Sequence, residues 1–62
     1  MKLTIKQKAF ADYYIELGNA TEAYKRAYKS CKSDNVARTN SSRLLTNANI
    51  KQYIDEKMKE FS

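Results

Sequence analysis

The residues of this chain best suited to chemistry with a partner molecule lie on one face of a helix expected at about 34–45. At helical spacing, its outer face carries Asn35, Arg38, Thr39, Ser42 and Arg43. Asn can pair bidentately with adenine and Arg with guanine, while Ser and Thr hydroxyls bond bases or phosphates. Asn, Thr and Ser are also poor helix formers, so helix stability does not explain their presence. The pattern favours a helix that enters the major groove of DNA over a merely solvated polar helix.

The positive charge of the chain is concentrated in its first 45 residues. The 62 residues include 12 Lys and Arg against 7 Asp and Glu, a net charge of +5. The segments 1–17, 18–31, 32–45 and 46–62 carry +1, +2, +2 and zero. A basic surface suggests a polyanionic partner, either nucleic acid or an anionic membrane, although modest charge also keeps small domains soluble. A membrane surface is disfavoured because no predicted helix joins a basic face to a large apolar one.

The segment before the polar helix supplies basic residues that could face phosphates. In helix-turn-helix docking, one helix crosses the DNA backbone and a short turn leads to a second helix in the groove. Near that turn would lie Lys25, Arg26, Lys29 and Lys32, and Ser33 would cap the second helix. The full set of predicted DNA-binding residues is Lys6, Lys25, Lys29, Lys32, Ser33, Asn35, Arg38, Thr39, Ser42 and Arg43.

The composition gives little support to catalysis or to a metal site. The chain has no His, so the common zinc ligand sets cannot be assembled, and its single Cys31 cannot form an intramolecular disulfide. It has no Gly-rich phosphate loop and no nucleophile–base pair, so we expect a non-enzymatic protein without a cofactor. No apolar run approaches the ~20 residues of a membrane span. Without a signal-peptide pattern either, we expect a soluble intracellular protein.

Start and stop signals predict one compact all-α domain of four helices that contains a helix-turn-helix. The four predicted helices span about 5–17, 20–29, 34–45 and 48–61. Thr4 and Gln7 form the pattern of a capping box at the first helix. Gly18, the only glycine, is expected to end this helix in the left-handed conformation. Asn19 is expected to cap the next helix, with Glu22 reaching back toward it, so the two helices meet at a sharp angle.

The buried side of each helix is predicted from apolar residues at helical spacing. Phe10, Tyr13, Tyr24, Leu44 and Ile54 are expected to share one core. The complete predicted stripes are Ala9, Phe10, Tyr13 and Leu17; Ala20, Ala23, Tyr24, Ala27 and Tyr28; Val36, Ala37, Asn40 or Ser41, Leu44 and Leu45; and Ile50, Tyr53, Ile54, Met58 and Phe61. A domain of this size has a small core, which leaves little room for an enclosed cavity.

Three stretches of the sequence, taken in order and spacing, resemble the N-terminal domain of the small terminase subunit of tailed bacteriophages. The family pattern is similar to L-T-x-K-Q-x-x-F, then N-A-T-x-A-Y, and later A-R-x-x-x-x-x-L-L-x-x-x-x-I. The matching residues are Leu3, Thr4, Lys6, Gln7 and Phe10; Asn19, Ala20, Thr21, Ala23 and Tyr24; and Ala37, Arg38, Leu44, Leu45 and Ile50. The match covers nearly the whole chain. The chain departs from the pattern at the turn, where the family usually carries a Gly-Tyr pair and "AYKSCKSD" has no glycine.

The resemblance implies a DNA-binding domain that recognises the viral packaging site and brings in the large terminase subunit, which has the ATPase and nuclease activities. It also implies a ring-shaped homo-oligomer for the full-length protein and a location in the host cell cytoplasm. Because the oligomerisation segment normally follows this domain, we expect the chain to be part of a longer protein.

The alternative is a small helical protein–protein interaction domain without DNA binding. Its contact surface would be the alanine-rich second helix or the Tyr side chains. The charge distribution favours DNA, because an interaction domain has no need to collect charge in three helices and cancel it in the fourth.

Overall fold

Four α-helices account for most of residues 3–60, the part of the chain described by this computed structural model. The helices are α1 (Ile5–Leu17), α2 (Ala20–Ala27), α3 (Asp34–Thr46) and α4 (Ala48–Glu60). No strand occurs within residues 3–60. The all-α fold class is therefore confirmed. Compared with the predicted boundaries, α2 ends two residues earlier, at Ala27 instead of residue 29, and α3 continues one residue further, to Thr46.

The corner between α1 and α2 forms as the sequence predicts. Thr4 Oγ1 accepts from the Gln7 amide, and Gln7 Oε1 accepts from the Thr4 amide, both at 3.0 Å. Gly18 follows α1 with φ of 67°, and its amide donates to the Tyr14 carbonyl at 2.8 Å. Asn19 Oδ1 then accepts from the Glu22 amide at 3.1 Å. Only two residues separate the helices, so left-handed backbone at the glycine sets the change of direction.

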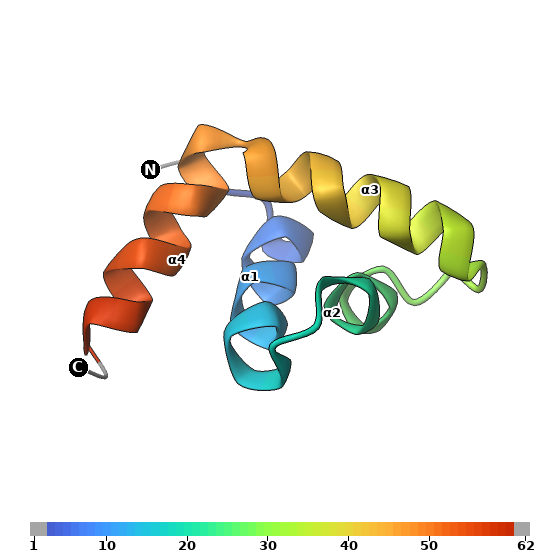
Figure 1. Ribbon diagram of the computed structural model, residues 1–62, viewed down its shortest axis with the longest axis horizontal. Coiled ribbons are helices and arrows are strands. Elements are labelled where there is room, and N and C mark those ends of the chain that lie inside the picture. Colours follow the sequence, from blue (N-terminus) through green and yellow to red (C-terminus); the bar gives the residue numbers. More distant parts are fainter. Residues whose placement is uncertain (1–2, 61–62) are drawn as a thin grey trace.

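Helix α1 lies in the middle of the molecule, with α2 and α4 packed on different sides of it and α3 running across α2 and α4 (Figure 1). The fully covered core consists of Phe10 and Ala11 from α1, Ala23 from α2, and Ile50 and Ile54 from α4. The Phe10 ring lies edge-on to the Tyr24 ring of α2, with 6.5 Å between their centroids. One aromatic side chain of α1 thus contributes to packing on both flanking helices.

The predicted core is confirmed at its centre and wrong at several helix ends. Phe10 and Ile54 are buried, and Tyr13, Tyr24 and Leu44 are partly buried against the same cluster. The residues wrongly placed inside are Leu17, Val36 and Met58, which are 37%, 48% and 51% exposed. Each lies in the first or last turn of its helix, where the neighbouring helices no longer cover the stripe. Phe61 lies outside the described residues.

A polar contact joins α4 to α1 at the edge of this core. The Tyr53 hydroxyl donates to Asp12 Oδ1 at 2.6 Å, and Lys57 Nζ lies 5.7 Å from the centroid of the Tyr53 ring. The hydrogen bond to the Asp12 carboxylate, together with partial burial, raises the pKa of Tyr53 to about 12. The phenol is therefore protonated, and able to donate, throughout the physiological pH range.

Replacing Phe10 by Ala should lower the free energy of unfolding by about 3–5 kcal/mol, because the ring is fully buried where α1 meets its neighbours. Such a loss is comparable to the whole stability expected of a domain this small. Thermal and urea unfolding, followed by circular dichroism, measure the effect. Ile5→Ala is the control on the same helix, because Ile5 is 89% exposed. Cooperative melting of Phe10→Ala within a few degrees of the unsubstituted chain would contradict this core.

Candidate nucleic-acid interface

Helix α3 presents the predicted polar residues on the side that faces away from the rest of the molecule. On its inner side, Ala37 and Ser41 are buried, at 0% and 2% exposure. The outer side consists of the exposed residues Asn35, Arg38, Thr39, Ser42 and Arg43. No other helix covers the outer side of α3 in Figure 1, where it forms the upper edge. The structure therefore brings these five side chains together on one accessible helix surface, which we call the α3 face.

The connector between α2 and α3, residues 28–33, turns without a glycine. The Tyr28 amide donates to the Tyr24 carbonyl at 2.8 Å, and the Cys31 amide donates to the Tyr28 carbonyl at 2.9 Å. Ser33 then caps α3, its Oγ accepting from the Val36 amide at 3.4 Å. Within residues 3–60, Gly18 alone has a positive φ, so no residue of the connector needs left-handed backbone. The connector therefore turns without the Gly-Tyr pair of the family pattern, and without a positive φ at any of its residues.

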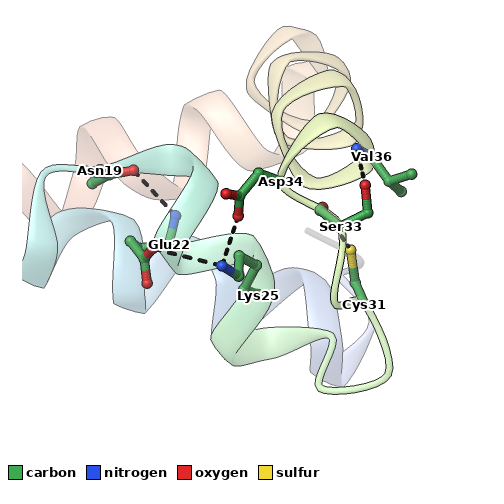
Figure 2. Close-up of polar contacts among 7 residues, drawn as sticks. All are labelled: Asn19, Glu22, Lys25, Cys31, Ser33, Asp34 and Val36. Atoms are coloured by element: carbon green, nitrogen blue, oxygen red, sulfur yellow. Dashed lines mark hydrogen bonds and ion pairs between the residues drawn. The ribbon is translucent and has the colours of Figure 1, made fainter.

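An ion pair joins the first turn of α3 to α2. Lys25 Nζ donates to Asp34 Oδ1 at 2.7 Å and lies 3.9 Å from Glu22 Oε1, as Figure 2 shows. The hydrogen bond and the opposite charge raise the pKa of Lys25 and lower the pKa of Asp34. The Lys25 ammonium therefore points to carboxylates of its own chain. Glu22, expected to reach back to Asn19, instead directs its carboxylate toward this ammonium.

A second polar contact ties the middle of α3 to α2. Asn40 Nδ2 donates to the Tyr24 hydroxyl at 3.0 Å, and the Tyr24 ring stacks on Tyr28 at 4.3 Å between centroids. Lys6 Nζ lies 5.6 Å from the centroid of the Tyr28 ring, so this predicted residue is brought beside the connector. Asp34 and Asn40 are about 9 Å apart along the α3 axis, from a rise of about 1.5 Å per residue. Two contacts at that separation set the orientation of α3 on α2.

Most of the positive charge in and around α3 takes no part in the ion pairs of Lys25 with Asp34 and Glu22. Residues 20–46 contain six cations (Lys25, Arg26, Lys29, Lys32, Arg38 and Arg43) and two anions (Glu22 and Asp34), so their net charge is +4. Both anions contact Lys25. Within residues 3–60, the other five cations form no ion pair, and all five are exposed. They remain available for an anionic partner.

Comparison with known proteins assigns the chain to a family. The family model described as terminase small subunit matches residues 3–62. The chain belongs to the terminase small subunit family. An uncharacterized protein of Haemophilus influenzae is 43% identical over 56 residues, which cover 87% of this chain and 33% of that protein. The chain thus spans about a third of the length of this relative. No solved structure matches this chain.

In this terminase small subunit domain, the predicted DNA-binding residues fall into two groups. Those on the α3 face, together with Lys29 and Lys32 of the connector, are exposed. Lys25, Ser33 and Lys6 have contacts within the chain: Lys25 with Asp34, Ser33 as the α3 cap, and Lys6 with the Tyr28 ring. Contact of any of these residues with DNA stays a prediction.

Sequence reasoning placed Val36 of this terminase domain inward, and the structure exposes it. Its position in the helix could have revealed this exposure. Val36 lies two residues after Asp34, where α3 starts, and precedes the part of the helix that packs on its neighbours.

The described residues contain no group of three or more potential metal ligands, and within them no helix is long and apolar enough to cross a membrane.

The Lys25–Asp34 pair predicts a pH dependence of stability for this terminase domain. Because folding lowers the pKa of Asp34, the pair contributes stability above the usual aspartate pKa of 3.8, and this is lost as the pH falls through the lowered value. Asp34→Asn should therefore lose less stability than the unsubstituted chain between about pH 5 and pH 2. Urea unfolding across that range measures the difference.

Asp55→Asn is the matched control, because Asp55 is an exposed carboxylate on α4 that forms no ion pair within the described residues. It should follow the unsubstituted chain. The same acid-induced loss in Asp34→Asn as in the unsubstituted chain would show that the pair adds nothing to stability.

Proposed function

We propose that this chain is the DNA-binding domain of a phage small terminase subunit, which recognises the viral packaging site to start genome packaging with the large ATPase and nuclease subunit. The observation that carries the proposal is the α3 face, a row of Asn, Arg, Thr and Ser side chains exposed along a helix held by two polar contacts. Membership of the terminase small subunit family supports the packaging role.

In this proposal, α2 and α3 act as a helix-turn-helix. Helix α2 crosses the sugar-phosphate backbone while α3 lies in the major groove, with the residues of its first turns closest to base edges. Asn35 and Arg38 have the donors and acceptors to read adenine and guanine. Lys29 and Lys32 of the connector contact the flanking phosphates. The order of the elements, with α3 exposed directly after the connector, is compatible with this docking.

In this proposal, electrostatic attraction supplies most of the affinity for DNA, and the contacts of α3 with base edges set the position of the domain along the DNA. Each cation that neutralises a phosphate releases condensed counterions, so binding weakens as salt rises. Lys29, Lys32, Arg38 and Arg43 can do this without breaking an ion pair within residues 3–60. Lys25 serves mainly to hold α3, since its charge is already paired with two carboxylates.

The proposal also concerns partners other than DNA. We infer that the full-length protein is a homo-oligomer, that it works with the large subunit, and that it does so in the host cell cytoplasm. The domain itself is a non-catalytic DNA-binding unit. The relative in Haemophilus influenzae, of which this chain matches about a third, leaves room for further segments.

Substituting Arg38 tests the placement of the DNA surface. Arg38→Ala should weaken binding by about 1–3 kcal/mol if Arg38 reads a base, with loss of discrimination among sequences. If it contacts only phosphate, the loss should be uniform, and the slope of log K against log salt should fall by about one unit. Fluorescence anisotropy titrations with packaging-site DNA and with random DNA, over a range of salt concentrations, separate the two.

Lys59→Ala is the matched control, because it also removes one positive charge but lies in the last turn of α4, away from α3 (Figure 1). Lys57 is less suitable because it lies against the Tyr53 ring and 3.9 Å from Glu60. Equal losses for Arg38→Ala and Lys59→Ala would mean that only total charge matters. Absence of DNA binding at low salt would favour the alternative, a protein–protein interaction domain.

A further inference from the structure

An apolar side chain interrupts the polar α3 face. Val36 is 48% exposed, although it is a branched hydrophobic residue in a chain with a very small core. Figure 2 shows its side chain pointing away from α2 and from the Lys25–Asp34 contact. It lies in the first turn of α3, next to Asn35 and one helical turn before Thr39.

Neither packing nor helix stability accounts for valine at this position. The amide of Val36 donates to the Ser33 cap, but any residue except proline would provide that donor. Valine is a weaker helix former than Ala, Glu, Lys or Gln, any of which would suit an exposed helix position. With about half of its side chain in water, it also gains only part of the free energy of burial.

The position of Val36 matches an apolar feature of DNA. The first turns of a recognition helix approach the base edges in the major groove. Those edges carry hydrogen-bond donors and acceptors, with one apolar group among them, the C5-methyl of thymine, and apolar side chains are its usual partners. Asn35 and Thr39, on either side of Val36 along the helix, have the polar groups to bind neighbouring positions.

We propose that Val36 is a specificity-determining residue that contacts the C5-methyl of a thymine in the major groove. The inference rests on the proposed DNA-binding function and adds a preference for thymine next to the bases read by the polar side chains. Docking of α3 would bury the exposed half of the valine side chain against the methyl group. The preference is hydrophobic, so uracil, which pairs as thymine does but lacks the methyl, removes it.

The test compares an alternating A·T duplex with the same duplex containing uracil at every thymine position, at low salt. Every base pair of this probe carries a thymine, so the first turn of α3 meets a methyl group in any register. The unsubstituted chain should bind the uracil duplex about fourfold more weakly, the value for one buried methylene-sized group. Val36→Ser should bind both duplexes equally, and Val36→Ile should retain the preference.

Ile5→Ser controls for the general loss of an exposed apolar residue, because Ile5 lies on α1 and is 89% exposed. It should keep the fourfold ratio, and circular dichroism confirms that each variant is folded. A ratio of one for the unsubstituted chain, or the same ratio in Val36→Ser, would overturn the assignment of Val36 while leaving DNA binding intact. If the unsubstituted chain bound neither duplex, the proposed function itself would fail.

Discussion

The arrangement of the helices depends on the packing of the Phe10 side chain. It is fully buried on α1 and belongs to one cluster with Ala23 of α2 and with Ile50 and Ile54 of α4. The other fully covered residues of α1 and α2 in this cluster are alanines, which allow the helices to approach closely but contribute little volume. Phe10 is therefore the one large side chain among the fully covered residues of α1 and α2 in this cluster, and the position of α2 determines where α3 can lie.

Helix α3 is held by polar contacts as well as by apolar packing. Its fully covered residues are small, Ala37 and Ser41, and the Ser41 hydroxyl donates to the Arg38 carbonyl of the same helix at 3.0 Å. Leu44 and Leu45 of α3 are partly buried against the core, and directional contacts with α2, made by Asp34 and Asn40, add to the orientation of the helix. Apolar burial tolerates rotation and sliding, whereas hydrogen bonds at two separated points do not. A small domain can thus direct one helix outward while keeping its polar face free.

Much of the fold could be predicted from local sequence signals. The Thr4–Gln7 capping box, the glycine at position 18 and the caps Asn19 and Ser33 all occur as predicted, because each depends on a few neighbouring residues. The spacing of polar residues likewise predicted which side of α3 is exposed.

The contacts between helices could not be predicted in the same way. The spacing rule treats a helix as covered along its whole length, so it failed for Leu17, Val36 and Met58 in end turns. The pairing of Lys25 with Asp34 depends on how α3 lies on α2, which no local pattern contains. Lys25, which stays a predicted DNA contact, therefore has an ion pair within the chain that the sequence did not indicate.

The single glycine marks a point where handedness, rather than space, limits the choice of residue. A β-carbon built on Gly18 would meet no atom within 4 Å, so a side chain fits there. The obstacle is φ of 67°, which L-residues rarely adopt and which their mirror-image counterparts prefer. A D-alanine introduced at this position by chemical synthesis would adopt this φ without strain and restrict the unfolded chain, the two conditions under which replacing a glycine stabilises a domain. L-alanine, with the same atoms, would strain it.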